Sequence, residues 1–486
     1  AYMGFQFVRV TADPGVTVER VEAVPVHTDV AEAGRFVCSN DVVNRLQDMS
    51  RASLLNNFHS IPTDCPHREK QGWTADTYMT DQAAIYNFDM AAFYAKWVED
   101  LAGTQDSAGG LCTVAPSTGY DQSISTVWPA AIVYVPWDLL AYYGDRRVVE
   151  RHYETMMRFA ESGLLRQRDG KPEIIGEVLG DWVSPHMTLS DTLMSYSMAP
   201  PEGLTLYGTA SHYRVVRNLA EVARFLGKRD DAVRLDAWAD RIARRFNEEF
   251  FDAASGIYHG ENPTPYRQAA NVVPLEYGLV PEADSARVLG SLLRDLDGTR
   301  DRIGTGFVGT LSMMELMPRI DPERAYRLAT QPDYPGWGFM ALSGATTMWE
   351  TWDGSASRNH PPFCLISAYF YKYLAGIRCD RAYPGFERFT VDPSVVGDLT
   401  FVEAWHDSPY GRIRSEWRRD GSRLTMKVSV PVGTTATIGV PTRDAAGVAE
   451  SGRPVSGTDG VKFLRAAGGK AFYEVGSGSY VFTSRL

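Results

Sequence analysis

The spacing of apolar residues divides the chain into three zones. Through residue 32, apolar residues alternate with polar ones, as in Phe5-Gln-Phe7 and Val24-Pro-Val26, which is typical of β-strands. Over residues 33–378 they recur every three or four positions, which predicts helices. Over residues 379–486 the alternation returns, as in Leu424-Thr-Met-Lys-Val428, between turns rich in Gly, Asp and Ser. This last pattern is typical of a sandwich of short strands.

The middle zone contains twelve predicted helices. One clear example is Val288-Leu-Gly-Ser-Leu292-Leu-Arg-Asp-Leu296, whose apolar side chains return at helical spacing. The predicted helices span residues 40–57, 75–86, 89–104, 127–143, 147–168, 203–226, 229–251, 266–278, 283–297, 307–318, 321–331 and 361–376. Long loops rich in Gly, Pro, Ser and Trp separate some of them, at 105–126, 169–202 and 332–360. In a closed ring of helical hairpins, such loops gathered on one face would build a site.

Size and charge narrow the classes of protein. A chain of 486 residues predicts two or three domains. The net charge of -11 argues against nucleic acid as a partner and, less strongly, against an anionic membrane surface, whereas a neutral substrate is compatible with it. The chain has neither an apolar run long enough for a membrane span nor a basic-then-apolar leader. It opens without Met on a strand-like pattern, so we interpret it as a fragment or processed piece, and the compartment and oligomeric state stay open.

The first candidate site is the stretch Asp64-Cys-Pro-His-Arg68-Glu69-Lys-Gln-Gly-Trp73-Thr-Ala-Asp76. Proline keeps its first half out of a helix, and the glycine marks a turn before a helix that starts near Thr74. Its three carboxylates therefore lie on a loop and at a helix N-terminus, where they can point into one space. The structural alternatives are a surface ion-pair cluster and, for Asp76, a helix cap. Cys65 lacks an identifiable base, so a buried free thiol is favoured for it, as for the other four cysteines.

The second candidate site surrounds Glu350, which lies between Trp349 and Trp352 and is followed by Asn359-His360. An aromatic wall of this kind is expected to raise the pKa of the carboxyl by desolvation. A salt-bridged structural glutamate with tryptophan neighbours in the core is the equally weighted alternative.

Tryptophan is the third signal. Flat indole rings with carboxylate acceptors suit the apolar C–H faces and polar rims of sugars. The tryptophans predicted near loops or helix edges are Trp73, Trp128, Trp137, Trp182, Trp337, Trp349 and Trp352. Two carboxyl groups that face each other across a sugar bond, one protonated and one ionised, are what glycoside hydrolysis requires.

Motifs for other chemistries are missing from the sequence. It contains no Walker loop, HExxH or GxSxG motif, and its nine histidines show no metal spacing. One GxGxxG match, Gly304-Thr-Gly-Phe-Val-Gly309, follows no strand-like run, so we interpret it as chance. We therefore expect an enzyme without metal or other cofactor.

These motifs resemble a known family. The run from Pro62 to Asp76 resembles the signature loop of the α-L-rhamnosidases of glycoside hydrolase family 78. The run Gly344-Ala-Thr-Thr-Met-Trp-Glu350-Thr-Trp-Asp353 and the following Asn359-His360 resemble the second signature of that family. The resemblance covers essentially the whole chain. It implies an (α/α)₆ barrel over residues 33–378, an antiparallel β-sandwich over 379–486, and residues 1–32 as the tail of a preceding β-sandwich domain.

The resemblance also implies roles. Glu69 corresponds to the general acid and Glu350 to the general base of an inverting exo-glycosidase that releases terminal α-L-rhamnose, with the carboxyl groups roughly 6.5–9.5 Å apart. The residues expected to hold the sugar are Asp64, Arg68, Trp73, Asp76, Trp128, Trp182 and His360. The segment between Glu350 and His360 is shorter than the family usually has, which puts the preference for leaving groups in question.

Two other functions stay open from the sequence. One is an (α/α)₆ glycosidase or lyase that acts on another sugar. A lyase would need cations to face an acidic substrate, for which Arg68 alone is thin support. The other is a catalytically inactive carbohydrate-binding homologue, against which the presence of both glutamates speaks.

Overall fold

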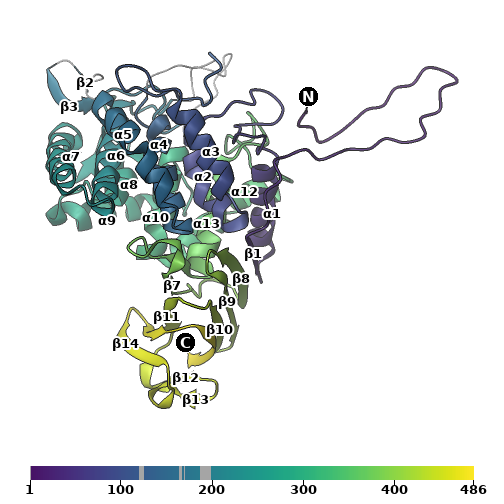
Figure 1. Cartoon of the computed structure of the whole chain (residues 1–486), viewed down its shortest axis with the longest axis vertical. Helices are drawn as coiled ribbons and strands as arrows, with labels where there is room; N and C mark the ends of the chain where they lie inside the picture. Colours follow the sequence, from purple (N-terminus) through teal and green to yellow (C-terminus); the bar gives the residue numbers. More distant parts are fainter. Residues whose placement is uncertain (1, 120–124, 164–166, 169, 186–198) are drawn as a thin grey trace.

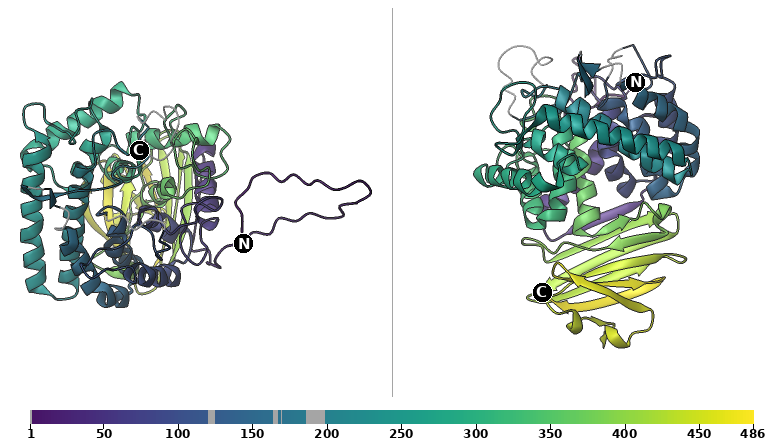
Figure 2. Two further views of the ribbon diagram at one scale, coloured as in Figure 1. Left: turned by 90° about the horizontal axis from the view of Figure 1, so that it is seen from above. Right: turned by 90° about the vertical axis from the view of Figure 1, so that its left-hand side faces the viewer.

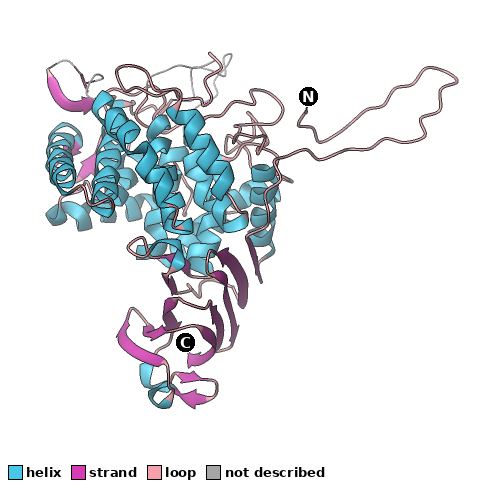
Figure 3. Cartoon of the chain, in the orientation of Figure 1, coloured by secondary structure: helices cyan, strands magenta, loops and turns pink. Residues whose placement is uncertain are grey.

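The computed structural model describes residues 2–119, 125–163, 167–168, 170–185 and 199–486. A helical body forms the upper part of the molecule in Figure 1, and a smaller β domain lies below it. Figure 3 shows the same division by secondary structure. Residues 2–31 leave the helical body as a long extended arm.

The helical body is a closed ring of helical hairpins, which Figure 2 shows from above. Within the described residues, six inner helices each pack against the next, and α13 packs back against α2 to close the ring. The inner helices are α2 (Thr74–Asn87), α4 (Ala131–Tyr143), α6 (Thr205–Phe225), α8 (Gln268–Tyr277), α10 (Phe307–Ile320) and α13 (Ile366–Tyr369), which a π-helical segment (Phe370–Leu374) continues. The outer helices are α1 (Asp41–Leu55), α3 (Ala91–Ala102), α5 (Arg146–Ser162), α7 (Arg229–Phe250), α9 (Glu282–Gly298) and α11 (Pro322–Thr330).

The burial of side chains explains why the helices sort into two layers. In α2 and α4 the residues are buried on almost every side, as expected for helices inside a large core. The outer α7 buries one stripe only, with Leu235, Trp238, Ile242 and Phe246 on it, and leaves charged residues on its other side. The predicted (α/α)₆ barrel is confirmed.

All twelve predicted helices are present, and most end within a few residues of the prediction. The longest error is in α5, which ends at Ser162 and not at residue 168; a short hairpin of β2 (Gln167–Arg168) and β3 (Lys171–Ile175) follows. One further helix, α12 (Trp337–Leu342), was not predicted. Its six residues are too short for a helical period to show in the sequence. In the part of the chain that is described, no helix has the length and apolarity to cross a membrane.

The β domain is a sandwich of two sheets. One has the strand order β1-β8-β9-β10-β16-β12-β13, and the other β14-β15-β11-β7-β6. Neighbouring strands are antiparallel, except that β7 and β11 run parallel. The strands of the first sheet are β1 (Gly34–Cys38), β8 (Phe401–Ser408), β9 (Gly411–Asp420), β10 (Arg423–Val430), β12 (Ala449–Glu450), β13 (Arg453–Pro454) and β16 (Gly478–Arg485). Those of the second are β6 (Ile377–Cys379), β7 (Arg388–Val391), β11 (Thr435–Pro441), β14 (Val461–Ala467) and β15 (Lys470–Val475).

Strand β1 connects the helical range of the chain with the β domain. It lies within the range assigned to the helical domain, yet it pairs with β8, from Gly34 opposite His406 to Cys38 opposite Val402. A Cβ atom on Gly34 would lie only 1.9 Å from the carbonyl oxygen of Tyr86 at the end of α2. The absence of a side chain therefore lets the β domain press directly against the inner ring.

The N-terminal arm also differs from the prediction. Residues 2–31 alternate in polarity as strands do, but none of them lies in a strand. The reason is that a strand needs a hydrogen-bonding neighbour, and along most of its length the arm extends away from the rest of the described chain (Figure 1). Its apolar side chains are exposed as a result, Phe7 to 85%. The assignment of residues 1–32 to the tail of a preceding domain stays a prediction.

Candidate active site

The two signature loops meet at the end of the ring where the inner helices begin. Helix α2 starts at Thr74, directly after the first loop, and ends at Asn87 beside the β domain, where the Tyr86 hydroxyl donates to the carbonyl of Ile377. Helix α10 starts at Phe307, whose ring stacks on His360 of the second loop. We call this end of the ring, which is remote from the β domain, the open end.

Hydrogen bonds within the first loop fix its carboxylates. The backbone N–H of Asp64 donates to the carbonyl of Gln71, and the N–H of Gln71 donates to Asp64 Oδ1 at 2.8 Å. Cys65 Sγ accepts from the N–H of Glu69 at 3.2 Å. Burial raises the pKa of the Cys65 thiol to about 11, so it stays neutral. Cys65 supports the loop as an acceptor and is not a nucleophile.

Gly72 explains how the loop turns into α2. Its carbonyl accepts from the N–H of Ala115, and a Cβ atom at this position would lie 2.0 Å from the Ala115 carbonyl oxygen. Trp73 then forms a β-bridge with Val114, and the helix begins at the next residue. The predicted turn and helix start are confirmed, and the glycine is needed for close backbone contact.

The second loop folds back on itself. The N–H of Glu350 donates to the carbonyl of Ser357 at 2.8 Å, and the N–H of His360 donates to the carbonyl of Met348 at 2.9 Å. These bonds bring Glu350 and His360 to one place although ten positions separate them. The amide of Asn57 joins the two loops, because it donates to Asn359 Oδ1 at 3.1 Å and accepts from the Thr63 hydroxyl.

Arg68 connects the two glutamates across the loops. Its Nη2 lies 2.8 Å from Glu350 Oε2 and 3.5 Å from Glu69 Oε1. On its other oxygen, Glu69 accepts from the indole N–H of Trp73 at 2.9 Å. Because both ion-pair distances end on one nitrogen, the two carboxylates lie close together at a single guanidinium group.

His360 carries a buried positive charge among carboxylates. Its Nε2 lies 3.1 Å from Asp76 Oδ1, and both side chains are buried. Burial alone would lower the pKa of His360, but Glu350, Asp76 and Asp64 outweigh it and raise the pKa to about 9. Burial also raises the pKa of Asp64 to about 6 and that of Asp76.

The pKa of Glu350 corrects the expectation from the sequence. Burial does act to raise it, but His360 and Arg68, together with the backbone N–H of Ser357 at 3.1 Å, lower it below its usual value. Trp349 and Trp352 alone suggested a raised pKa, because the histidine ten residues further on and the arginine of the other loop were not visible as neighbours. Glu350 is therefore ionised at neutral pH.

Buried polar atoms without hydrogen bonds remain in this group. They are Asp64 Oδ2 and His360 Nδ1, and the indole Nε1 of Trp128 is a third such atom near the start of α4. Leaving a buried polar atom unpaired costs about 1–3 kcal/mol. A ligand with several hydroxyl groups can serve such donors and acceptors.

The remaining tryptophans take different positions. Trp128 lies in the turn Trp128–Ala130, which packs against α2. The carbonyl of Trp182 accepts from the N–H of Phe307. The ring of Phe307 in turn stacks on His360, so Phe307 connects Trp182 with the second loop. Trp352 corrects the predicted aromatic wall: it is 1% exposed, stacks on Phe363, and belongs to the core, as does Trp337.

The residues of the GxGxxG match form the start of helix α10. Asp181, which is fully buried, accepts from the N–H groups of Gly306 and Gly309, both at 2.7 Å. These bonds satisfy free donors at the start of α10. In the described ranges, no three or more His, Cys, Asp or Glu side chains are grouped so that they could hold a metal ion.

Comparison with known proteins shows the family of this chain. Residues 31–374 match the family model described as the bacterial alpha-L-rhamnosidase 6 hairpin glycosidase domain. Residues 376–453 match the model of the bacterial alpha-L-rhamnosidase C-terminal domain. The chain belongs to the bacterial α-L-rhamnosidase family. The resemblance inferred from the two signature loops is thereby confirmed.

Individual family members agree along most of the chain. A curated α-L-rhamnosidase from Streptomyces avermitilis is 30% identical over 99% of this chain and 45% of its own length. The structure of the α-L-rhamnosidase from Dictyoglumus thermophilum is similar with a TM-score of 0.87 and 32% identity, over 97% of this chain and 52% of that one. A Streptomyces avermitilis α-L-rhamnosidase structure complexed with L-rhamnose has a TM-score of 0.82 and 28% identity, over 94% of this chain and 42% of that one. The chain thus spans about half the length of these rhamnosidases.

Sequence reasoning missed the residues that hold the two loops together. Asn57, Cys65 and Ser357 contact the loops or the glutamates directly, yet none has a chemical signature of its own. Cys65 and Ser357 lie inside or next to the motifs, so a reading of the motifs as hydrogen-bonded turns would have found them. Asn57 lies at the end of α1, and only the tertiary structure connects it with Asn359.

Proposed function

We propose that this chain hydrolyses terminal α-L-rhamnosides, with Glu69 as the general acid and Glu350 as the general base. The single observation that supports this most is that both glutamates lie within ion-pair distance of one atom, Arg68 Nη2, at 3.5 and 2.8 Å. They are brought there from loops more than 280 positions apart. Two carboxyl groups that face each other are the requirement of this reaction.

The environments of the two glutamates fit different roles. His360 and Arg68 keep Glu350 ionised, as a base that takes a proton from water must be. Glu69 is more exposed, with 24% of its side chain accessible compared with 6% for Glu350. Trp73 fixes one of its oxygens. The other oxygen is then available to donate a proton to the leaving group.

In the proposed reaction, Glu69 protonates the glycosidic oxygen while that oxygen leaves the anomeric carbon. Glu350 removes a proton from a water molecule, whose oxygen bonds to the same carbon from the opposite face. The products are free rhamnose of inverted configuration and the alcohol, and the proton taken by Glu350 restores Glu69 through solvent.

The sugar would be held by the groups that surround the glutamates. Asp64 Oδ2 and His360 Nδ1 are buried and lack hydrogen bonds, so sugar hydroxyls would satisfy them. Asp76 and Arg68 would bind further hydroxyls, while the rings of Trp73, Trp128 and Trp182 would offer apolar faces to the sugar. L-rhamnose is the ligand in the related Streptomyces avermitilis structure.

The stereochemistry needs its own measurement. Inverting enzymes keep their carboxyl groups roughly 6.5–9.5 Å apart and retaining ones about 5–5.5 Å. Glu350 Oε2 and Glu69 Oε1 lie 2.8 and 3.5 Å from the same atom, Arg68 Nη2. The distance between these two oxygens therefore cannot exceed the sum of the two contacts. This bound lies between the two ranges.

The deciding experiment is a screen of aryl glycosides followed by NMR of the first anomer released. We expect hydrolysis of the aryl α-L-rhamnoside and β-L-rhamnose as the first product. A first product of α configuration would refute inversion, and hydrolysis of another glycoside in place of the rhamnoside would refute the substrate. An unsaturated product that absorbs in the ultraviolet would indicate a lyase, and L-rhamnose binding without any turnover would indicate an inactive homologue.

A further inference from the structure

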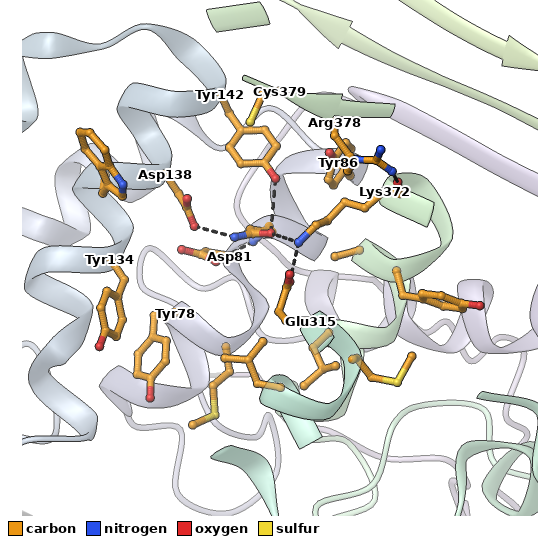
Figure 4. Close-up of a pocket in the computed structure, with 18 of the residues that line it drawn as sticks. Tyr78, Asp81, Tyr86, Tyr134, Asp138, Tyr142, Glu315, Lys372, Arg378 and Cys379 are labelled. Atoms are coloured by element: carbon orange, nitrogen blue, oxygen red, sulfur yellow. Dashed lines mark hydrogen bonds and ion pairs between the residues drawn. The ribbon is translucent and has the colours of Figure 1, made fainter. Parts of the chain in front are cut away.

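A separate cavity of about 310 Å³ lies inside the ring, toward the β domain (Figure 4). Each of the six inner helices contributes to its lining: Tyr86 of α2, Tyr142 of α4, Arg214 of α6, Glu276 of α8, Glu315 of α10 and Lys372 in the continuation of α13. We call it the axial cavity. Its described lining includes none of the nine residues assigned above to catalysis or sugar binding. It is therefore distinct from the open end.

Most charged groups in the axial cavity are compensated, and Asp81 is the exception. Lys372 pairs with Glu315, Arg381 pairs with Asp138, and Arg214 Nη1 lies 3.7 Å from Glu276 Oε2. Gln82 links the first two pairs, since it accepts from Lys372 at 2.9 Å and donates to Asp138 Oδ2 at 3.0 Å. Figure 4 shows the part of this network that runs from Asp138 to Lys372 and Glu315. A lining without a dominant charge favours a neutral ligand over an ion.

Aromatic side chains form much of the remaining wall. Tyr86, Tyr142 and Trp137 line the cavity from α2 and α4, with Tyr134 and Tyr78 further toward the open end. Rings beside hydrogen-bonding groups match a ligand with apolar C–H faces and several hydroxyls. The volume lies at the lower end of the range for small-molecule sites, roughly 300–1,000 Å³.

Several hydrogen-bonding groups of the wall are unsatisfied in the described structure, among them Asp81, Tyr134 and Tyr369. Asp81 Oδ2 and Tyr369 Oη have no hydrogen bond, although their side chains are only 2% and 3% exposed. Burial and the nearby Asp138 raise the pKa of Asp81 well above its usual range. A hydroxyl group is the natural partner for both atoms, because it donates and accepts.

The most accessible charged side chains of the lining lie on the side of β6. The side chain of Arg381 is 42% exposed, that of Arg378 28% and that of Glu315 23%, whereas that of Asp138 is 5% exposed. These side chains lie next to the β domain, at the opposite end of the ring from Glu69 and Glu350.

We propose that the axial cavity is a second binding site, for a neutral polyhydroxylated molecule of monosaccharide size. The compensated charges, the aromatic wall and the unsatisfied Asp81 and Tyr369 together specify this chemistry. The plain alternative is a cluster of ordered waters, each with its share of liquid volume of about 30 Å³. The site does not depend on the reaction proposed for the open end.

The test combines soaked crystals with calorimetry, using glycerol, myo-inositol and L-rhamnose as probes. We expect at least one probe in the axial cavity, in contact with Asp81 Oδ2 or Tyr369 Oη. Tyr369→Phe, which keeps the shape of the wall, should weaken binding of that probe about fivefold. Ala368→Leu, which fills the cavity from α13, should abolish it. Tyr473→Phe in β15 is the matched control, with unchanged affinity.

The outcomes separate this proposal from the previous one. Water alone in the axial cavity with all three probes would overturn it, as would equal probe affinity in Tyr369→Phe and the wild-type chain. If Ala368→Leu does not fold, the soaks and Tyr369→Phe decide the question. Hydrolysis of an aryl rhamnoside, measured on the same wild-type and Tyr369→Phe samples, should be equal. If the wild-type chain does not hydrolyse the aryl rhamnoside, the reaction proposed for the open end is refuted, whereas the proposal for the axial cavity still stands.

Discussion

At the open end of the ring four carboxylates share two cations, whereas in the axial cavity three of the four carboxylates each have a cation of their own and Asp81 is the exception. The open-end group consists of Asp64, Glu69, Asp76 and Glu350 with Arg68 and His360. The axial pairs are Glu315 with Lys372, Asp138 with Arg381, and Glu276 with Arg214. The open-end group lies on the two signature loops and the first turn of α2, whereas the axial pairs lie on inner helices and, for Arg381, directly after β6.

The comparison shows where the chain buries carboxylates without one cation for each of them. Uncompensated carboxylates raise one another's pKa and make burial costly, and this cost is concentrated around the two glutamates. Paired charges at the other end hold the helices in position instead. Functional sites commonly combine perturbed pKa values in this way.

The largest expected effect tests the two glutamates at the open end. Glu350→Gln should lower kcat by about 10³–10⁴, because a general base is lost while the fold is kept. Glu69→Gln should lose as much on a rhamnoside with a poor leaving group, but much less on one whose leaving group needs no proton. Steady-state kinetics on both types of aryl rhamnoside measure the difference.

Glu403→Gln on the exposed face of β8 is the control and should retain wild-type rates. Wild-type rhamnose release by either glutamate variant would refute the assignment of roles. Identical losses of Glu69→Gln on both leaving groups would remove Glu69 as the acid.

The second expected effect concerns the charge on His360. His360→Gln removes a cation that lowers the pKa of Glu350, so the acid limb of the kcat/KM profile should move to higher pH by about one unit. The loss of a sugar contact should add a decrease of about tenfold at the optimum. A full pH profile separates the shift from the decrease.

His152→Gln on α5, which contacts Glu99, is the control for a buried histidine elsewhere and should leave the profile unchanged. A lower rate with an unshifted acid limb would show that His360 binds the sugar but does not keep Glu350 ionised.

The third prediction sets one substitution at the open end against the same substitution in the axial cavity. Burial raises the pKa of Asp64 from 3.8 to about 6. Its protonation therefore favours the folded state below pH 3.8, and this contribution is lost as the pH rises through about 6. Asp64→Asn avoids the penalty and should increase the free energy of unfolding by about 2 kcal/mol at pH 7, with no gain near pH 3.5.

Asp138→Asn should have the opposite sign, a loss of about 1–2 kcal/mol at pH 7, because it breaks the pair with Arg381 and leaves that guanidinium without its partner. Denaturant unfolding of both variants at the two pH values measures the contrast. Two destabilised variants, or a stabilisation by Asp64→Asn that persists at low pH, would contradict the comparison of the two ends.

The smallest effect is expected from Trp73→Phe. It removes the indole N–H that Glu69 accepts at 2.9 Å but retains an aromatic ring against the sugar. One neutral donor to a carboxylate contributes about 1 kcal/mol, so kcat should fall about fivefold with little change in KM. Trp405→Phe in β8, on which Arg412 stacks, should have no effect; a rise in KM alone for Trp73→Phe would make Trp73 a binding residue only.

Much of the fold could be predicted because its signals are local. The apolar stripe of α7 and the all-round burial of α2 are written in the spacing of their own residues. Strand β1 and the arm show the limit of such signals. Both alternate in polarity, yet β1 pairs with β8 more than 360 positions away, while the arm has no neighbouring strand in the described chain along most of its length.

The candidate site divides in the same way. The sequence by itself determined the two loops, their carboxylates and their family, because each motif is contiguous and chemically unusual. Only the tertiary structure decided that Arg68 contacts both Glu69 and Glu350, that His360 lowers the pKa of Glu350, and that six helices enclose an axial cavity. Charges act through space over a few ångströms, and the residues that supply them to one another here lie hundreds of positions apart in the chain.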